Sequence, residues 1–423
     1  MKKTTSSLLR NNFIQGGILF TFANVFVGFL NYLFNSLSAK TLGPSGYSEI
    51  TTLFAYLTLL SVPILVITTE IVRRLGLRGK DKLKTLKRWE TWLMNKAKRW
   101  TYLLVPYFLL GFLLPRLTNL SLFSSFILLT YLVLSFIGAF YTASLQGLHR
   151  FWSISWIIFV VALIKLAGPL VHFPYQEQLT TILLFLVLSG TIGIVLSKIA
   201  LKTDKVSSVE DKPEKDLEKR LSDVLLSKSV FITVGSLVGI NVLNNLDVIF
   251  TKKFYPAFDA GIYGGWSLLA KIIFYIYGPL LSLSLIYFSS RAYRKYSQKV
   301  LLVGLLFFVM TGFFFYFTYS LFGSRIIALI FNRRYMLILP YLSYAAIFGS
   351  LYTGIYFLNT FFLAKNSSFS LIALVCAPIY ALLLFFSGKT LQAIMTINIL
   401  VAIAIFSLYL GFIFYYNMKH NGG

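Results

Sequence analysis

Two ionisable side chains lie inside long apolar segments of this 423-residue chain, where a charge is costly unless it faces water or a partner. Asp247 and Lys271 both belong to the stretch Asn241–Pro279, on either side of a short loop predicted at 252–259. Lys271 is about ten residues into its segment, which is near mid-bilayer at a helix rise of 1.5 Å per residue. A lysine at that depth predicts either a functional residue in a polar cavity or one half of a buried ion pair with Asp247.

Asp247 itself has two interpretations. It lies roughly 7 Å from the outer end of its segment by helix rise, so it could be an interfacial acid paired with Lys252, Lys253 or Lys271. It could also act as a gate or as the site of a coupling ion, Na+ or H+, because an acid within a membrane helix is a candidate for ion transport.

Lys165 is the second basic residue within an apolar segment. It is nearer the outer end than Lys271, so its long side chain could also reach the membrane surface. If both lysines face one cavity, the lumen is cationic and suits an anionic solute such as a diphosphate, which lysine binds as a point charge.

Asparagine residues mark the first helix of each predicted half. At about 100° per residue the first helix carries a narrow polar stripe, formed by Gly17, Thr21, Asn24, Gly28, Asn31 and Asn35. The corresponding helix of the second half has a broader face with Asn241, Asn244 and Asn245. The stripes indicate either a cavity in which Asn24, Asn31, Asn241 and Asn244 bind sugar or water, or close helix packing joined by asparagine.

The composition is that of an integral membrane protein. The chain is 57% hydrophobic and 13% charged, against about 45–50% and about 25% in soluble domains, and its apolar runs reach the roughly 20 residues of a spanning helix. The net charge of +25 lies between the spans, so it favours membrane orientation and not nucleic-acid binding. A single cysteine, three scattered histidines and the lack of nucleotide-binding or hydrolase motifs predict no metal, no cofactor and no enzymatic activity.

We predict an all-α polytopic fold with about twelve spans in two six-helix bundles, related by a pseudo-two-fold along the membrane normal and forming a V around a central cavity. Seven of the 14 acidic residues fall in one polar linker. This divides the chain into an N-terminal bundle at 1–200, a cytoplasmic charged linker at 201–228 and a C-terminal bundle at 229–423. The expected spans are 12–36, 47–70, 102–114, 122–145, 152–171, 179–200, 229–250, 261–288, 300–322, 339–363, 369–386 and 391–416. A basic amphipathic connector at 73–99 is expected along the membrane surface.

The basic residues set the expected orientation. With a cytoplasmic N-terminus, about 29 of the 39 lysines and arginines fall in segments on the inner side and about eight on the outer side, as the positive-inside rule requires. The prediction is a multi-pass protein of the cytoplasmic (inner) membrane with both termini in the cytoplasm.

Four stretches resemble a family: AKTLGPSGYSEITTLFAYLTLLSVPI (39–64), SLQGLHRFW (144–152), NLDVIFTKKFYPAFDAGIYGGWSLLAK (245–271) and FLAKNSS (362–368). The chain is similar to polysaccharide or oligosaccharide repeat-unit flippases of the Wzx type, within the multidrug/oligosaccharidyl-lipid/polysaccharide flippase superfamily. The resemblance implies transfer of undecaprenyl-diphosphate-linked oligosaccharides across the cytoplasmic membrane by alternating access, for surface polysaccharide biosynthesis. It implies cationic cavity residues, for which Lys165 and Lys271 are the candidates, and an ion gradient as the driving force.

The expected partners are the lipid-linked oligosaccharide, membrane lipids, a coupling Na+ or H+ and the glycan polymerase machinery. Three alternatives remain open: an ion-coupled multidrug exporter of the same superfamily, a lipid II flippase, and a non-transporting membrane scaffold.

Overall fold

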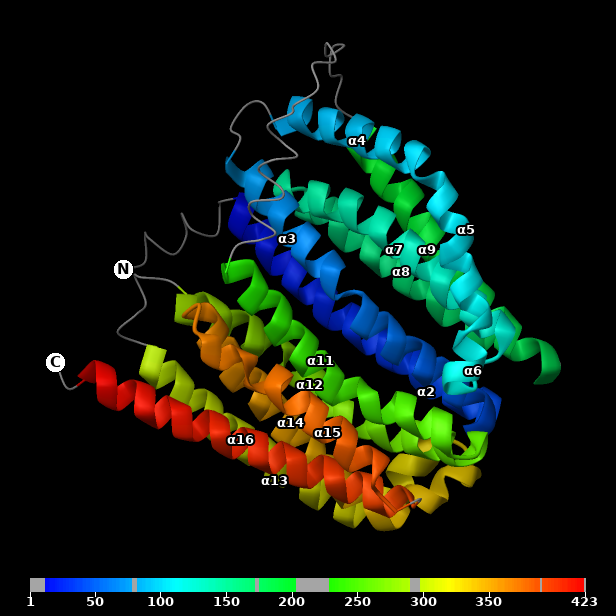
Figure 1. The fold of residues 1–423 in the computed structure, drawn as a ribbon, viewed down its shortest axis with the longest axis vertical. Coiled ribbons are helices and arrows are strands. Elements are labelled where there is room, and N and C mark those ends of the chain that lie inside the picture. The colour runs from blue at the N-terminus through cyan, green and yellow to red at the C-terminus, as the bar shows by residue number, and fades with distance from the viewer. Residues whose placement is uncertain are drawn as a thin grey trace. The chain divides into compact units, whose positions relative to one another are not determined.

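A computed structural model describes residues 12–77, 82–171, 175–202, 228–289, 297–388 and 390–421 (Figure 1). Every regular element within these ranges is a helix, which confirms the predicted all-α polytopic class. Most of the predicted charged linker at 201–228 falls outside the described residues, and only its ends are seen, as extensions of the flanking helices.

The contacts between residues separate the chain into two units. The first unit comprises Met1–Phe34 and Leu60–Leu221, and the second comprises Asn35–Leu59 and Ser222–Gly423. Residues 35–59 therefore pack with the second unit, whereas the division by consecutive sequence at 1–200 and 229–423 stays a prediction. One helix, α2 (Asn12–Leu60), contributes residues to both units.

The first unit holds long helices that pack side by side, with α8 (Phe151–Leu170) on α9 (Tyr175–Lys202), and α7 (Leu122–Gly147) on both α9 and α3 (Val62–Leu77). Its further elements are α4 (Lys82–Arg99), η2 (Thr101–Leu103), α5 (Leu104–Leu109), η3 (Leu110–Phe112) and α6 (Leu114–Thr118).

In the second unit, α14 packs on α12, α13 and α16, while α11 packs on α15. The elements are α11 (Lys228–Phe254), α12 (Ala257–Ser289), α13 (Ser297–Ile330), η5 (Arg333–Tyr341), α14 (Leu342–Ala364), η6 (Ser368–Leu371), α15 (Ile372–Phe385) and α16 (Leu391–Asn421).

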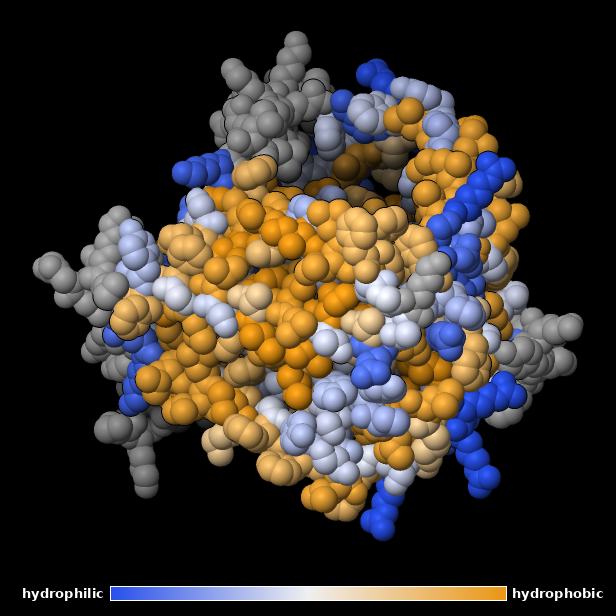
Figure 2. Space-filling model, turned by 60° about the horizontal axis from the view of Figure 1, so that its bottom comes forward, coloured by the Kyte–Doolittle hydropathy of each residue, from blue (hydrophilic) through white to orange (hydrophobic). Residues whose placement is uncertain are grey.

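Ten helices in the described part of the chain are long and apolar enough to cross a membrane. Many of their large apolar side chains are exposed, and Figure 2 shows such side chains covering much of the face in view. An exposed apolar surface of this extent would be unstable in water and is the surface expected toward lipid.

The first two predicted spans meet at a kink and not at a loop. The sequence predicted a connection at 37–46, but α2 is helical on both sides of Gly43, whose φ of 67° and ψ of −179° are non-helical. A positive φ of this kind favours glycine, and Pro44 begins the next helical segment, where its fixed φ is suitable. The predicted loop is therefore wrong, and a single residue makes the break.

Two other boundaries differ from the prediction because charged residues can extend an apolar helix beyond its hydrophobic run. Lys252 and Lys253 lie in the last turn of α11, although a loop was predicted from 252. Arg325, placed in an outer loop by hydropathy, lies within α13. The predicted third span is broken into α5, α6 and two short 3-10 segments, with a proline in each of the two α-helical pieces.

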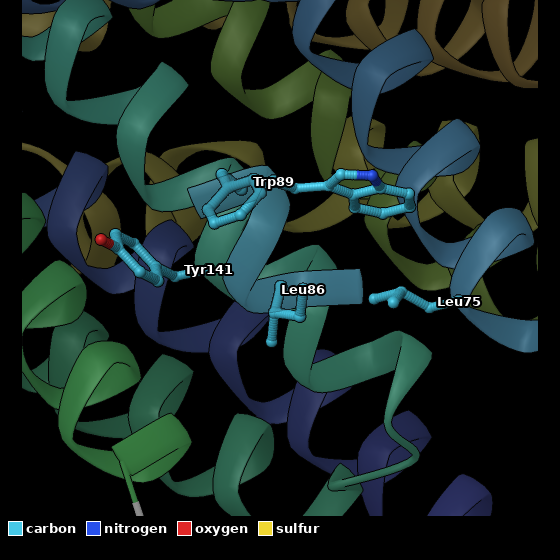
Figure 3. Packing of buried hydrophobic residues seen from close by; sticks show 5 residues of the cluster. Leu75, Leu86, Trp89 and Tyr141 are labelled. Carbon is cyan, nitrogen blue, oxygen red and sulfur yellow. The ribbon is translucent and has the colours of Figure 1, made fainter. Parts of the chain in front are cut away.

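The amphipathic connector forms α4, as its pattern predicted. Its apolar face packs on the first unit through Leu86 and Trp89, which form a buried cluster with Leu75, Phe140 and Tyr141 (Figure 3). The hydroxyl of Tyr141 donates to Glu90 Oε1 at 2.9 Å. The opposite face carries exposed basic side chains, so the helix combines attachment to the unit with a cationic surface.

Candidate functional site

Lys165 of α8 lies beside α2 within the first unit. Its Nζ donates a hydrogen bond to Asn31 Oδ1 at 2.9 Å and lies 4.4 Å from the centroid of the Phe34 ring. Both contacts stabilise a cation, since the amide oxygen carries partial negative charge and the aromatic face attracts cations. The structure thus brings together two of the predicted site residues, Lys165 and Asn31, and places a basic side chain inside an apolar span.

Asn24 does not join this group. Its side chain is exposed and its Nδ2 donates to the carbonyl of Phe20, one turn earlier in the same helix, at 2.7 Å. This bond satisfies one of its donors locally, as polar side chains in membrane helices commonly do. A role in binding sugar remains a prediction for this residue.

Asp247 lies at the centre of a hydrogen-bond network within the second unit. Its side chain is 0% exposed. Oδ2 accepts a hydrogen bond from the hydroxyl of Tyr263 and another from Asn398 Nδ2 at 3.0 Å. The Asn398 amide is in turn oriented by Tyr380, whose hydroxyl donates to Asn398 Oδ1 at 2.7 Å. The network joins α11, α12, α15 and α16, so it links four helices around one carboxylate.

A small cavity adjoins this network. It has a volume of about 10 Å³ and is lined by nine residues, among them Tyr380 and Asn398, with apolar side chains such as Leu243 and Val401 completing the wall. A volume of that order holds about one water molecule. Two polar residues of the network, Tyr380 and Asn398, thus reach the cavity, whereas Asp247 is not among its lining residues.

Lys271 lies near Asp247 on α12. Its Nζ donates to Asn245 Oδ1 at 3.4 Å, and its charge interacts electrostatically with the carboxylate of Asp247. The hydrogen bonds of Asp247 go to Tyr263 and Asn398, so the interaction with Lys271 is one of charge through space. The interpretation of Asp247 as a partner of Lys252 is wrong, because Lys252 bonds elsewhere in the same unit.

The two remaining asparagines of α11 have less defined roles. Asn241 is half-buried, and its backbone carbonyl accepts from Asn245 Nδ2 at 2.9 Å. The Oδ1 atom of Asn244 is buried and makes no hydrogen bond with any described residue. Neither residue is brought into the network of Asp247, and their predicted contact with substrate stays a prediction.

Comparison with known proteins shows which fold carries these site residues. No family model and no curated protein matches the sequence. An inward-facing multidrug resistance MATE family transporter of the MOP superfamily matches 90% of this chain and 93% of its own, with a TM-score of 0.69 at 13% identity. The chain shares the fold of that transporter.

Two further MOP-like structures support this assignment of the fold. The lipid II flippase MurJ in an inward closed conformation matches 95% of this chain and 100% of its own, with a TM-score of 0.53 at 16% identity. A MOP superfamily transporter from Pyrococcus furiosus, described by a reversed polarity of its binding pocket, matches 97% and 98%, with a TM-score of 0.53 at 13% identity. The MOP fold therefore accompanies proteins that differ in what they move.

Within this MOP fold, sequence reasoning missed a buried ion pair. Lys252 is 4% exposed, and its Nζ lies 2.7 Å from Glu49 Oε1 and donates to Ser48 Oγ at 2.9 Å. Glu49 is also buried, at 8% exposed, so both charges of the pair are shielded from solvent. The pair joins α2 and α11 inside the second unit.

Sequence reasoning also missed Tyr263, Tyr380 and Asn398 as members of the Asp247 network. Asn398 could have been found from the sequence, because it is an amide in the middle of the apolar run 391–416. The cost of a polar group inside a membrane helix, which selected Asp247, applies to it as well. The two tyrosines offered none, because tyrosine is common in this chain, with 26 copies. Among the described residues no group of three or more His, Cys, Asp or Glu side chains could hold a metal ion.

Proposed function

We propose that this chain is a flippase that transfers undecaprenyl-diphosphate-linked oligosaccharide repeat units across the cytoplasmic membrane by alternating access. The observation that carries the proposal is the Lys165 ammonium, held inside an apolar span by Asn31 and Phe34. A fixed cation in a region of low dielectric attracts a diphosphate far more strongly than it would in water. The MOP fold, which MurJ shares, supports movement of a lipid-linked substrate.

In the proposed mechanism the chain binds and moves its substrate without covalent chemistry. Lys165 and Lys271 steer the diphosphate, and Asn24, Asn31, Asn241 and Asn244 bind sugar or water. The lipid tail stays in the bilayer while the head group passes. Surface polysaccharide biosynthesis would supply the substrate and consume the product, and the glycan polymerase machinery would be its partner on the receiving side.

Substitution of Lys165 tests the proposal. In a host that lacks its own repeat-unit flippase, Lys165→Ala should reduce surface glycan at least tenfold at equal amounts of folded protein. Lys165→Arg keeps the charge and should retain a larger share. Lys198→Ala is the matched control, because this lysine lies near the cytoplasmic end of α9 by the positive-inside orientation and outside the proposed site. Wild-type export by Lys165→Ala would refute the role of Lys165.

Lys271 is the second proposed steering residue and is tested in the same host. Lys271→Ala should lower surface glycan and, because it removes the charge that faces Asp247, should also alter any ion dependence of export. Unchanged export and unchanged ion dependence would remove Lys271 from the site while leaving the role of Lys165 intact.

Asp247 is the proposed site of ion coupling. Asp247 is fully buried and accepts two hydrogen bonds, and an intramembrane acid is costly without a partner or a functional role. Asp247→Asn preserves shape and should abolish the dependence of transport on an imposed Na+ or proton gradient. Transport that still follows the gradient in Asp247→Asn would place coupling elsewhere.

The multidrug resistance transporter with the same fold favours an alternative, an ion-coupled drug exporter. A drug-susceptibility panel in cells that overexpress the chain separates the two functions, since an exporter raises resistance to several compounds. A second alternative is a lipid II flippase, and the fold shared with MurJ supports it. Rescue of a host depleted of its lipid II flippase would favour this role in peptidoglycan synthesis. If the chain is a non-transporting scaffold, none of these assays should respond. Deletion of the chain should then remove a member from a glycan assembly complex.

A further inference from the structure

One side of α12 is open and carries a basic residue within the apolar span. Lys271, Tyr275 and Gly278 follow one another at the spacing i, i+4 and i+7, which places them on the same side of the helix. Tyr275 is 44% exposed, and Lys271 is half-buried. A Cβ at Gly278 would meet no atom within 4 Å. Open space therefore adjoins this side of α12, which extends over about 10 Å of helix from Lys271 to Gly278.

Tyr356 of α14 continues this surface on the neighbouring helix. The ring of Phe274 contacts both tyrosines, with its centroid 6.2 Å from that of Tyr275 and 5.0 Å from that of Tyr356. Tyr352 lies one turn before Tyr356 and within electrostatic range of both Tyr275 and Tyr356. Because α12 and α14 pack on each other within the second unit, the three α12 residues and Tyr356 form one surface, which we call the tyrosine face.

The polar groups of the tyrosine face have few partners in the described part of the chain. The Lys271 ammonium has three donors, and its one hydrogen bond with a described residue is the long contact of 3.4 Å with Asn245 Oδ1. The hydroxyls of Tyr275 and Tyr356 make no hydrogen bond with any described residue, and both side chains are held through ring contacts. Unpaired donors are costly in hydrocarbon, so this surface requires water or a polar ligand and not lipid tails.

The chemistry of the tyrosine face suits a sugar. One side of a sugar ring presents C–H groups, which pack on aromatic rings, and its edge carries hydroxyls that donate and accept. A phenol offers both a ring and a hydroxyl that donates and accepts. Lys271 adds a cation at one end, which suits the phosphate that bears the first sugar. A hydrocarbon chain would leave the ammonium and the hydroxyls without hydrogen-bond partners, and an organic cation would be repelled by the ammonium.

We propose that the tyrosine face binds the first sugars of the lipid-linked oligosaccharide. Tyr275 and Tyr356 stack on the sugar rings while Lys271 contacts the diphosphate, and Phe274 is a positioning residue that packs against both tyrosines. The inference rests on the proposed function, because it assigns the sugars of the same substrate to named residues. Stacking depends little on which hydroxyls a sugar carries, so the face accepts more than one kind of sugar.

A set of soluble probes separates the sugar from the rest of the ligand. The reference probe is geranyl diphosphate with a methyl group on its terminal phosphate, so that its charge equals that of the sugar-bearing probes. The sugar-bearing probes carry N-acetylglucosamine, glucose or galactose in place of the methyl group. Isothermal titration calorimetry gives their Kd values with the full-length protein in amphipol, which contains no sugar. At least one sugar-bearing probe should bind about fivefold tighter than the reference, as expected for aromatic stacking. If none binds more tightly, the proposal is overturned.

Variants assign this sugar preference to the two tyrosines. The double variant Tyr275→Leu with Tyr356→Leu keeps apolar volume but loses both rings, so it should reduce the preference to less than twofold. Tyr316→Leu, at an exposed tyrosine of α13 outside the face, is the matched control and should keep the full preference. Each variant is compared as monodisperse protein with a cooperative thermal transition. A full preference in the folded double variant would contradict the proposal.

Two glycines test the space beside the face. A Cβ at Gly411 of α16 also meets nothing within 4 Å, so both positions have room for the start of a side chain. Gly278→Trp places a ring in the space assigned to the sugar and should lower the sugar preference at least threefold, whereas Gly411→Trp should not. An unchanged preference in folded Gly278→Trp protein would count against a sugar at this position.

The same assays separate this inference from the proposed function. Lys165→Ala should keep the sugar preference while it loses glycan export. If the wild-type protein exports no glycan but prefers a sugar-bearing probe, the proposed function fails and the tyrosine face stands. If glycan export is normal while no sugar-bearing probe is preferred, the tyrosine face fails and the proposed function stands.

Discussion

Lys252 of α11 and Glu49 of α2 form a buried ion pair, with 2.7 Å between Nζ and Oε1. Lys252 also donates to the hydroxyl of the neighbouring Ser48 at 2.9 Å. The pair thereby holds the second helical segment of α2 against α11. Residues 35–59 belong to the second unit by their contacts. The pair matters because removal of either residue would leave the other without its buried counter-charge.

Breaking this pair should destabilise the protein strongly. Glu49→Gln leaves the Lys252 ammonium buried without its carboxylate, which costs about 3–5 kcal/mol in comparable buried pairs. The expected result is a clear fall in the thermal unfolding midpoint in detergent. The double variant Glu49→Leu with Lys252→Met should recover much of it, since an apolar pair of similar volume is often neutral. Lys40→Met, at an exposed lysine, is the control, and an equal shift in Glu49→Gln and Lys40→Met would show that the pair contributes nothing.

The Asp247 network predicts an order of stability losses. Asn398→Ala removes a donor to a charged group, worth about 1.5–3 kcal/mol, and Tyr380→Phe removes a bond between neutral groups, worth about 0.5–1.5 kcal/mol. The unfolding midpoint should therefore fall further in Asn398→Ala. Because the two residues contact each other, the double variant should lose less than the sum of the two. A larger loss in Tyr380→Phe would contradict this order, because it would mean that the tyrosine hydroxyl contributes more than the bond from Asn398 to the carboxylate.

Two glycines of α12 predict opposite outcomes for the same substitution. A Cβ at Gly261 would lie 1.7 Å from the carbonyl oxygen of Pro44, which is backbone and cannot move aside as a side chain can. A Cβ at Gly278 meets nothing within 4 Å. Gly261→Ala should sharply reduce the yield of folded protein. Gly278→Ala should be neutral or stabilise by up to about 1 kcal/mol through helix propensity. Equal behaviour in expression and melting would contradict the close approach of α12 to residue 44.

The attachment of α4 depends on one tryptophan. Trp89 is buried in the cluster with Leu75 and Leu86, so Trp89→Ala should cost about 3–5 kcal/mol. Trp92 is only partly buried, with Lys96 Nζ 5.7 Å from its ring centroid, and Trp92→Ala should cost much less. Limited proteolysis at the lysines of α4 measures how far this helix detaches from the other helices of the first unit. Equal protection in both variants would show that other contacts hold the helix.

Local properties of the sequence predicted most of the fold. Hydropathy located the spans because the cost of a charge or an unpaired backbone group in lipid acts on each segment separately. The same cost selected Asp247, Lys165 and Lys271 as residues that need a partner. The amphipathic pattern at 73–99 predicted α4, since its period is visible without knowledge of any neighbour.

Tertiary partners were not predictable in this way. Asn398 bonds Asp247 across 151 residues, and no periodicity connects two helices so far apart in sequence. Lys252 was assigned to a loop because a lysine ends a hydropathic run, although burial against Glu49 lets the helix continue. The break at Gly43 was read as a loop of ten residues, because glycine and proline indicate an interruption but not its length.

Helix α2 carries two anchors five residues apart. Asn31 accepts from Lys165 in the first unit, and Ser36 Oγ donates to the carbonyl of Ile330 in the second at 2.7 Å. The segment between them is continuous helix with a rise of about 7.5 Å, and it is far stiffer than a loop of equal length. The amide that holds Lys165 Nζ therefore lies on a rigid stretch of helix and not on a loop.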